Sequence, residues 1–160
     1  MLAVKLKKSS IVFIVLTVLS ALFFILNSLA SSEASNAASG FFVSLFTNYL
    51  FPTSDTNTIH IITLIVRKLA HFTEFAVFFG FFNSFMISQN AYKNRMFYFL
   101  TLFLVLCVPL LDETTQYLSP GRTPMVYDVW IDAAGGVFGI IASSAIYKLV
   151  RKKMLKDKRI

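Results

Sequence analysis

The sequence predicts an all-α integral membrane protein, a four-helix bundle with one further amphipathic helix lying at the extracytoplasmic interface. Hydrophobic residues make up 56% of the 160 residues, charged residues make up only 14%, and eighteen residues are phenylalanine. Soluble domains contain about 45–50% apolar and about 25% charged residues, so both values depart in the direction of a membrane protein. Four apolar stretches each approach the roughly 20 residues that a helix needs to cross a bilayer. We therefore expect residues 1–160 to form a single multi-pass membrane domain.

The four predicted spans cover about residues 9–30, 67–88, 96–112 and 128–150. Backbone N–H and C=O groups find no water inside lipid, so each span is expected to be a helix. An outer segment, residues 31–66, joins the first two spans, and a basic tail, residues 151–160, follows the last. The first span also resembles a cleavable signal peptide, because lysines precede it and the small residues Ser28 and Ala30 end it. That alternative stays open, and we expect the span to be retained.

The outer segment carries the pattern of a helix that lies flat on the membrane surface. Apolar and aromatic residues recur there at helical spacing, namely Phe41, Phe42, Leu45, Phe46, Tyr49 and Leu50. Ser44, Thr47 and Asn48 fall on the opposite face, and amphipathic helices of this kind lie in the interface. Asp55, with the serine and threonines around it, is a candidate cap for a following helix that continues into the second span.

The basic residues gather on one side of the predicted membrane and set its orientation. Twelve of the fifteen lysines and arginines fall on the side of the two termini, with only one of the eight acidic residues. The opposite side holds seven acidic residues and three basic ones, Arg67, Lys68 and Arg122. Because cytoplasmic loops carry an excess of lysine and arginine, we expect both termini in the cytoplasm. The net charge of +7 then reflects topology and attraction to anionic lipid headgroups, and it indicates no nucleic-acid partner.

Polar residues at the outer ends of three spans form the candidate functional site. Arg67, His71 and Glu74 share one face of the second span because they are four and three residues apart, and Lys68 flanks that face. The third and fourth spans and their connecting loop add Asp112, Glu113, Gln116, Arg122, Asp128 and Asp132. Ionisable residues inside spans face the bundle interior and mark functional sites. We therefore expect these side chains to meet at one membrane depth.

Two functional roles are compatible with this set of residues. In a catalytic site, His71 would be the general acid and base, Glu74 would orient it, and Asp112 or Glu113 would be a second base or a metal ligand. In a binding site, Arg122 would grip a phosphate or carboxylate. Further ligand-binding residues would then be Arg67, Lys68, Gln116, Asp128 and Asp132. The cluster has one histidine and the chain one cysteine, so we assign no metal centre and no cofactor.

A purely structural role is the alternative for each of these residues. A basic residue at the start of the second span could pair with Asp112 or Asp128 and only fix helix packing, and Asp128 could instead cap the fourth span. Gly135 and Gly139 are four residues apart, with alanines and a further glycine nearby. A small-residue face of this kind is typical of close packing between helices.

Taken in order, four polar motifs resemble the VanZ-like family. They are residues 67–75 (RKLAHFTEF), 112–116 (DETTQ), 120–122 (PGR) and 128–135 (DVWIDAAG), with serines at 31, 32, 35 and 39 after the first span. The resemblance implies a small multi-pass membrane protein of Gram-positive bacteria, and the name-giving member is associated with low-level teicoplanin resistance. The positions that match the family's polar positions are His71, Glu74, Asp112, Glu113, Gln116, Arg122, Asp128 and Asp132.

The resemblance and the polar cluster together lead to two functional hypotheses. In the first, the chain binds a lipid-linked cell-wall precursor or a lipoglycopeptide at the outer membrane face, and aromatic residues of the interfacial helix hold acyl chains. This would contribute to teicoplanin-type resistance or to maintenance of the cell envelope. In the alternative, the chain is a membrane enzyme that acts on a lipid phosphate or cell-wall precursor. An ion path ranks last, because four short spans leave little room for one, and the oligomeric state stays open.

Overall fold

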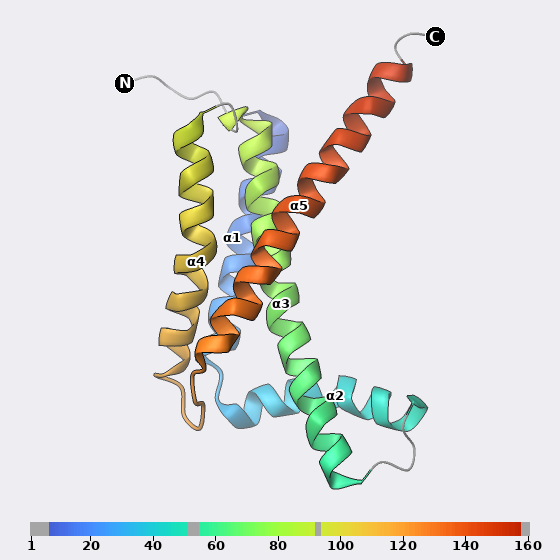
Figure 1. Ribbon diagram of the computed structural model, residues 1–160, viewed down its shortest axis with the longest axis vertical. Coiled ribbons are helices and arrows are strands. Elements are labelled where there is room, and N and C mark those ends of the chain that lie inside the picture. Colours follow the sequence, from blue (N-terminus) through green and yellow to red (C-terminus); the bar gives the residue numbers. More distant parts are fainter. Residues whose placement is uncertain (1–6, 51–54, 92–93, 158–160) are drawn as a thin grey trace.

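The computed structural model describes residues 7–50, 55–91 and 94–157. Its five helices are α1 (Lys8–Leu29), α2 (Ser32–Leu50), α3 (Thr56–Ser88), α4 (Arg95–Gln116) and α5 (Val126–Asp157) (Figure 1). The described residues contain no strand, so the predicted all-α class is confirmed for them. Four lysines and arginines counted in the charge asymmetry (Lys5, Lys93, Lys158 and Arg159) lie outside the described residues, as does the turn expected after α2.

Three of the helices are long and apolar enough to cross a membrane, namely α1, α4 and α5. Helix α3 is long enough to cross a membrane, but it is not apolar enough to be counted with these three. Its segment within the bundle carries the polar residues Arg67, His71, Glu74 and Asn83. Large apolar side chains on the three span-capable helices point away from the bundle. An apolar surface this extensive is suited to lipid and not to water. The chain is therefore a membrane protein, whereas the fourth predicted span stays a prediction.

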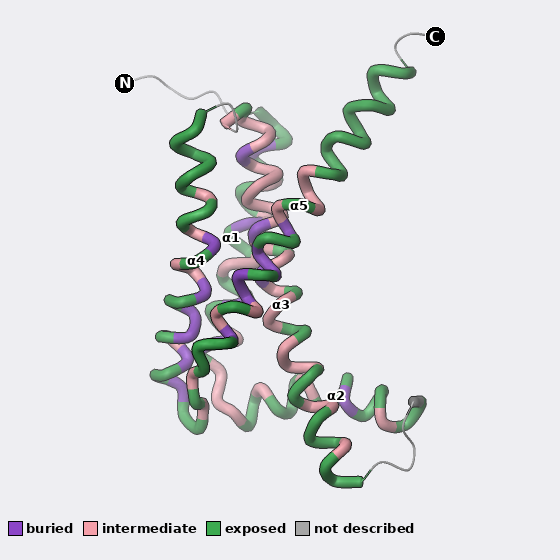
Figure 2. The backbone as a smooth tube through the Cα atoms, in the orientation of Figure 1, coloured by how far each residue is buried: buried purple, intermediate pink, exposed green. Residues whose placement is uncertain are grey.

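Helices α1, α3 and α4 run side by side, and α5 crosses α3 before its C-terminal half leaves the bundle (Figure 1). The buried residues concentrate where these helices meet, and the far end of α5 is exposed (Figure 2). The core is small and aromatic, formed by Phe24, Phe75, Phe79, Val105 and Ala133. The Phe24 and Phe75 rings stack with centroids 5.1 Å apart, which joins α1 to α3.

Helices α3 and α5 approach each other until their backbones touch. A Cβ atom added at Gly135 would lie 2.2 Å from the carbonyl oxygen of Phe72, and one added at Gly139 would lie 2.1 Å from that of Ala76. No side chain fits at such distances, so both positions require glycine. The predicted small-residue packing face is thereby confirmed, and its partner is α3.

Helix α2 is longer than the predicted amphipathic segment, which starts at Phe41. It begins at Ser32, where the hydroxyl of Ser31 accepts the backbone N–H of Ala34 at 3.2 Å and caps the helix. The backbone N–H of Ser32 also donates to the carbonyl of Pro120 at 3.2 Å, which ties the start of α2 to the loop between α4 and α5. Helix α2 lies across the end of the bundle (Figure 1).

Helices α3 and α5 both extend beyond their predicted spans. Asp55 caps α3 by accepting the backbone N–H of Thr58 at 2.9 Å, so the expected continuation of this helix from the outer segment is confirmed. Helix α5 contains 32 residues and is therefore about 48 Å long at 1.5 Å per residue. Residues 151–157 of the predicted basic tail are thus helical.

Candidate functional site

The predicted polar residues gather at one end of the bundle. This end of the bundle contains the C-terminal ends of α1 and α4, the N-terminal end of α5, and the part of α3 around His71. At the other end, the hydroxyls of Ser10 and Ser88 are 2.7 Å apart, which fixes α1 antiparallel to α3. The alternation of helix direction therefore collects polar residues that are distant in sequence. Their side chains form the polar cluster described below.

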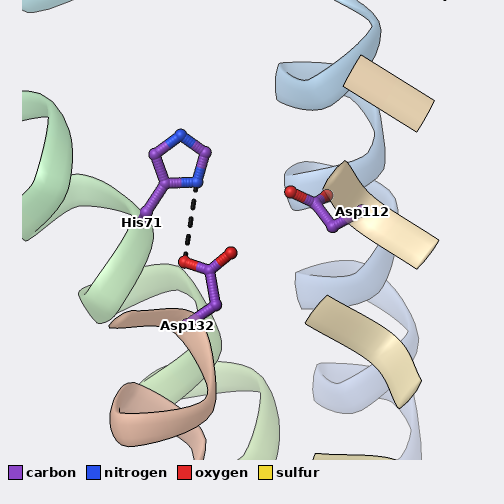
Figure 3. A group of neighbouring side chains, drawn as sticks. All are labelled: His71, Asp112 and Asp132. Carbon is purple, nitrogen blue, oxygen red and sulfur yellow. Dashed lines mark ion pairs between the residues drawn. The ribbon is translucent and has the colours of Figure 1, made fainter. Parts of the chain in front are cut away.

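His71, Asp112 and Asp132 form the centre of the polar cluster, and they come from α3, α4 and α5 (Figure 3). The Nδ1 atom of His71 lies 3.8 Å from Oδ1 of Asp132. One potential ligand atom from each of the three residues lies within 4.8 Å of the other two. Asp132 is fully buried, and neither of its oxygens has a hydrogen-bond partner among the described residues. Ionising an unpaired buried carboxylate is costly, so a proton or a cation close to Asp132 would stabilise the site.

Asp112 is oriented by two hydrogen bonds. The hydroxyl of Ser28 on α1 donates to its Oδ1, and Nε2 of Gln116 donates to its Oδ2 at 2.8 Å. Ser119 helps to hold Ser28 in position, because its hydroxyl donates to the backbone carbonyl of Ser28 at 2.7 Å. The contribution of α1 was absent from the predicted site. Its only signal in the sequence is Asn27 and Ser28, two polar residues at the end of a long apolar run.

The two glutamates of the cluster face other partners than His71. Glu74 accepts a hydrogen bond from Nδ2 of Asn27 at 2.8 Å, and Glu113 accepts one from the backbone N–H of Met125 at 2.9 Å. The expected pairing of His71 with Glu74 is therefore wrong, because the carboxylate within ion-pair distance of His71 is that of Asp132. The three-residue spacing on α3 turns Glu74 toward α1 while His71 faces α5.

Arg122 lies in the loop between α4 and α5 and is partly buried. Its Nε and Nη1 atoms are buried and have no hydrogen-bond partner within the described part of the chain. Burial lowers the pKa of Arg122, as does the nearby charge of Arg67, whereas Asp112, Glu74 and Glu113 act in the opposite direction. A guanidinium keeps its charge in proteins, so hydrogen bonds from these nitrogens to an anion would stabilise it.

Lys68 and Asp128 form an ion pair between two helices, as expected if these residues have a structural role. Their side chains form an ion pair that joins α3 to the start of α5, and the lysine Nζ also lies 4.8 Å from the centroid of the Tyr127 ring. Asp128 stands inside the first turn of α5 and not at the residue before it, so the structure favours the ion pair over the alternative that Asp128 caps the helix. Arg67 is half-buried and forms no ion pair among the residues described.

We expect the Lys68–Asp128 pair to stabilise the fold, measured as a coupling energy of about 1 kcal/mol, because the pair is partly shielded from solvent. The measurement is a double-mutant cycle with Lys68→Met and Asp128→Asn, with unfolding followed in detergent micelles. Each single variant should lose stability, and the double variant should lose less than the sum. Strictly additive losses would show that the pair contributes nothing.

Two grooves border the helices, and one of them adjoins the polar cluster. A groove of about 470 Å³ runs between α1, α2 and α3, with apolar walls that include Phe23, Phe42 and Phe46 and with Glu74 also in its lining. Phe41 and Tyr49, which were also expected to hold acyl chains, do not line it. The larger groove, of about 790 Å³, lies between α3, α4 and α5, and its mostly apolar lining includes Lys148, Arg151 and Lys152 of α5.

Comparison with known proteins agrees with the predicted resemblance. A family model described as VanZ/LLP1 matches residues 12–151, a range that includes every residue of the polar cluster. No curated protein and no solved structure matches the chain. The matched range covers most of all five helices, including α3 with its polar residues. The chain therefore belongs to the VanZ/LLP1 family.

Proposed function

We propose that this chain is a multi-pass protein of the cell membrane, with four spans and both termini in the cytoplasm. The support for the fourth span is that α3 packs between α1 and α5 and runs antiparallel to α1, so it shares their membrane depth. The support for the orientation is that Lys8, Arg95 and the basic end of α5 lie at the end opposite the polar cluster. Helix α2 would then be the interfacial helix of the outer face.

The function that we propose is recognition of an anionic headgroup, carried by a lipid-linked cell-wall precursor or another lipidated ligand, at the outer membrane face. The observation that carries it is Arg122, whose buried Nε and Nη1 atoms have no protein partner in the described residues. Arginine presents these donors in a planar fork that matches phosphate and carboxylate oxygens. Arg67, close enough to act on Arg122 electrostatically, would add a second positive charge.

The groove between α1, α2 and α3 supports the lipid part of the ligand. Its apolar walls suit an acyl or polyprenyl chain, and Glu74 connects the groove to the polar cluster. A ligand of this shape would place its chain against Phe42 and Phe46. Its headgroup would extend past Glu74 toward Arg122, which does not line the groove but is close enough to Glu74 for the two charges to interact. A contribution to teicoplanin-type resistance or to envelope maintenance would follow, because teicoplanin also carries an acyl chain.

Recognition is favoured over the enzymatic alternative by the surroundings of His71. Among the described residues no carboxylate orients His71 through a hydrogen bond, since Asp132 is 3.8 Å from its Nδ1 atom and Glu74 is bonded to Asn27. The unpaired donors of Arg122, in contrast, are suited to binding without any chemical step.

We expect Arg122→Gln to weaken binding of a polyprenyl diphosphate by about tenfold or more, because charge-assisted hydrogen bonds contribute about 1.5–3 kcal/mol. The measurement is native mass spectrometry of the purified protein, titrated with this lipid in excess phosphatidylglycerol. Lys152→Gln is the matched control, since it removes one positive charge in the opposite groove. Gel filtration confirms that both variants are folded. Equal losses in the two variants would mean that the lipid responds to net charge only, and the proposal would fail.

A further inference from the structure

The most unusual group in the polar cluster is Asp132. Its relative exposure is 0%, and both of its oxygens lack a hydrogen-bond partner among the described residues. The Nδ1 atom of His71, also buried and without a hydrogen-bond partner there, faces it at 3.8 Å. This separation is too long for a hydrogen bond, although the two groups point toward each other (Figure 3). A positively charged group between them would therefore be favoured.

Asp112 points into the same space from α4 (Figure 3). Together with His71 and Asp132 it offers one imidazole nitrogen and two carboxylate oxygens, all within 4.8 Å of one another. Ligand atoms about 2.0–2.2 Å from one metal ion in tetrahedral geometry lie about 3.3–3.6 Å apart, so the three side chains would have to close around the ion by roughly 1 Å, which rotation of the side chains can supply. Three protein ligands with open positions are typical of zinc and related divalent ions.

The surroundings of Asp112 resemble the outer support of a metal site. Its two oxygens accept hydrogen bonds from Ser28 and Gln116, which hold the carboxylate in place and leave further lone pairs free. Nothing comparable orients Asp132, whose oxygens are free of competing bonds in the described chain. The cluster thus combines the carboxylate of Asp112, which two hydrogen bonds hold in place, with that of Asp132, which accepts none among the described residues.

We infer that His71, Asp112 and Asp132 bind a divalent first-row metal ion, of the Zn²⁺ or Mn²⁺ class, at the outer end of the bundle. The imidazole nitrogen disfavours Mg²⁺ and Ca²⁺, which prefer oxygen ligands only. The sequence analysis assigned no metal centre and named Asp112 or Glu113 as a possible metal ligand. Of these two, Asp112 lies in the group, whereas Glu113 accepts the backbone N–H of Met125. The inference goes beyond headgroup recognition and does not depend on it.

The test uses the full chain, purified with a tag that contains no histidine and stripped of metal with a chelator. The protein is incubated with Zn²⁺ or Mn²⁺ alone, without added lipid ligand, and bound metal is counted by inductively coupled plasma mass spectrometry. Asp132→Asn keeps the size of the side chain and removes its charge. Asp157→Asn makes the same change at an exposed position of α5 and is the control.

We expect about one ion per chain in the unaltered protein and in Asp157→Asn, and at least about a hundredfold weaker binding in Asp132→Asn. Ser28→Ala should weaken binding by about 10–100-fold, the effect typical of losing an outer support. The inference is overturned if the unaltered protein retains neither ion, or if Asp132→Asn binds as well as Asp157→Asn. A higher melting midpoint in Asp132→Asn, without metal binding by the unaltered protein, would instead assign Asp132 a bound proton. Because no lipid is added, these results are independent of the Arg122 experiment.

Discussion

Gly135→Ala is expected to lose most of its folded protein, although it adds only one methyl group. That methyl carbon would lie 2.2 Å from the carbonyl oxygen of Phe72, and the obstacle is backbone that cannot rotate away. Helices α3 and α5 would have to separate by more than 1 Å to reach ordinary contact, about 3.5–4.0 Å between atoms. Overpacking a core typically costs about 1–3 kcal/mol, and a forced separation of two backbones should exceed that range.

The same separation should dismantle the polar cluster. His71 is adjacent to Phe72, and Asp132 lies one helical turn before Gly135, so both shift when the helices move apart. We therefore expect the variant to lose ligand and metal binding together with stability. The measurement is the thermal unfolding midpoint in detergent, followed by size-exclusion chromatography.

Gly40→Ala is the matched control for this substitution. Gly40 lies within α2, and a Cβ added there would have no neighbouring heavy atom within 4 Å. Alanine is a better helix former than glycine by about 1 kcal/mol, so this variant should be as stable as the unaltered chain or slightly more stable. Equal stability of the Gly135 and Gly40 variants would contradict the close α3–α5 contact.

The sequence was sufficient to predict that ionisable residues of α3, α4 and α5 meet at one end of the bundle. Alternating spans place the start of one helix beside the end of the next, so charges at His71, Asp112 and Asp132 had to fall at the same end. Because burying a charge in an apolar environment is costly, ionisable residues inside predicted spans indicate a functional site. A close helix contact at Gly135 and Gly139 was also predicted from their spacing, whereas its partner α3 was not.

The pairing inside the cluster could not be predicted in the same way. Spacing along one helix fixes which residues share a face, but the rotation of each helix against its neighbours decides which faces meet. Glu74 was expected beside His71 and instead meets Asn27, because α1 packs along that side of α3. Asn27 and Ser28 could not be identified as part of the site, because neutral polar residues are common at the ends of membrane spans and do not by themselves indicate a function.

The side of the membrane on which the polar cluster lies decides which ligands can reach it. If it opens outward, its ligands are envelope lipids, drugs and extracytoplasmic metal ions. If it opens inward, the proposed ligand class is wrong. The chain has one native cysteine, Cys107, so a Cys107→Ser background permits single reporter cysteines to be placed at will. Thr123, exposed in the Arg122 loop, and Asp157, exposed at the far end of α5, mark the two ends.

The decisive measurement is labelling of these two positions in intact cells with a maleimide that does not cross membranes. We expect Thr123→Cys to be labelled at once, and Asp157→Cys to be labelled only after the cells are permeabilised. The contrast should be close to all-or-none, because a bilayer separates the two ends. The opposite pattern, with Asp157→Cys labelled in intact cells and Thr123→Cys protected, would contradict an outward-facing site.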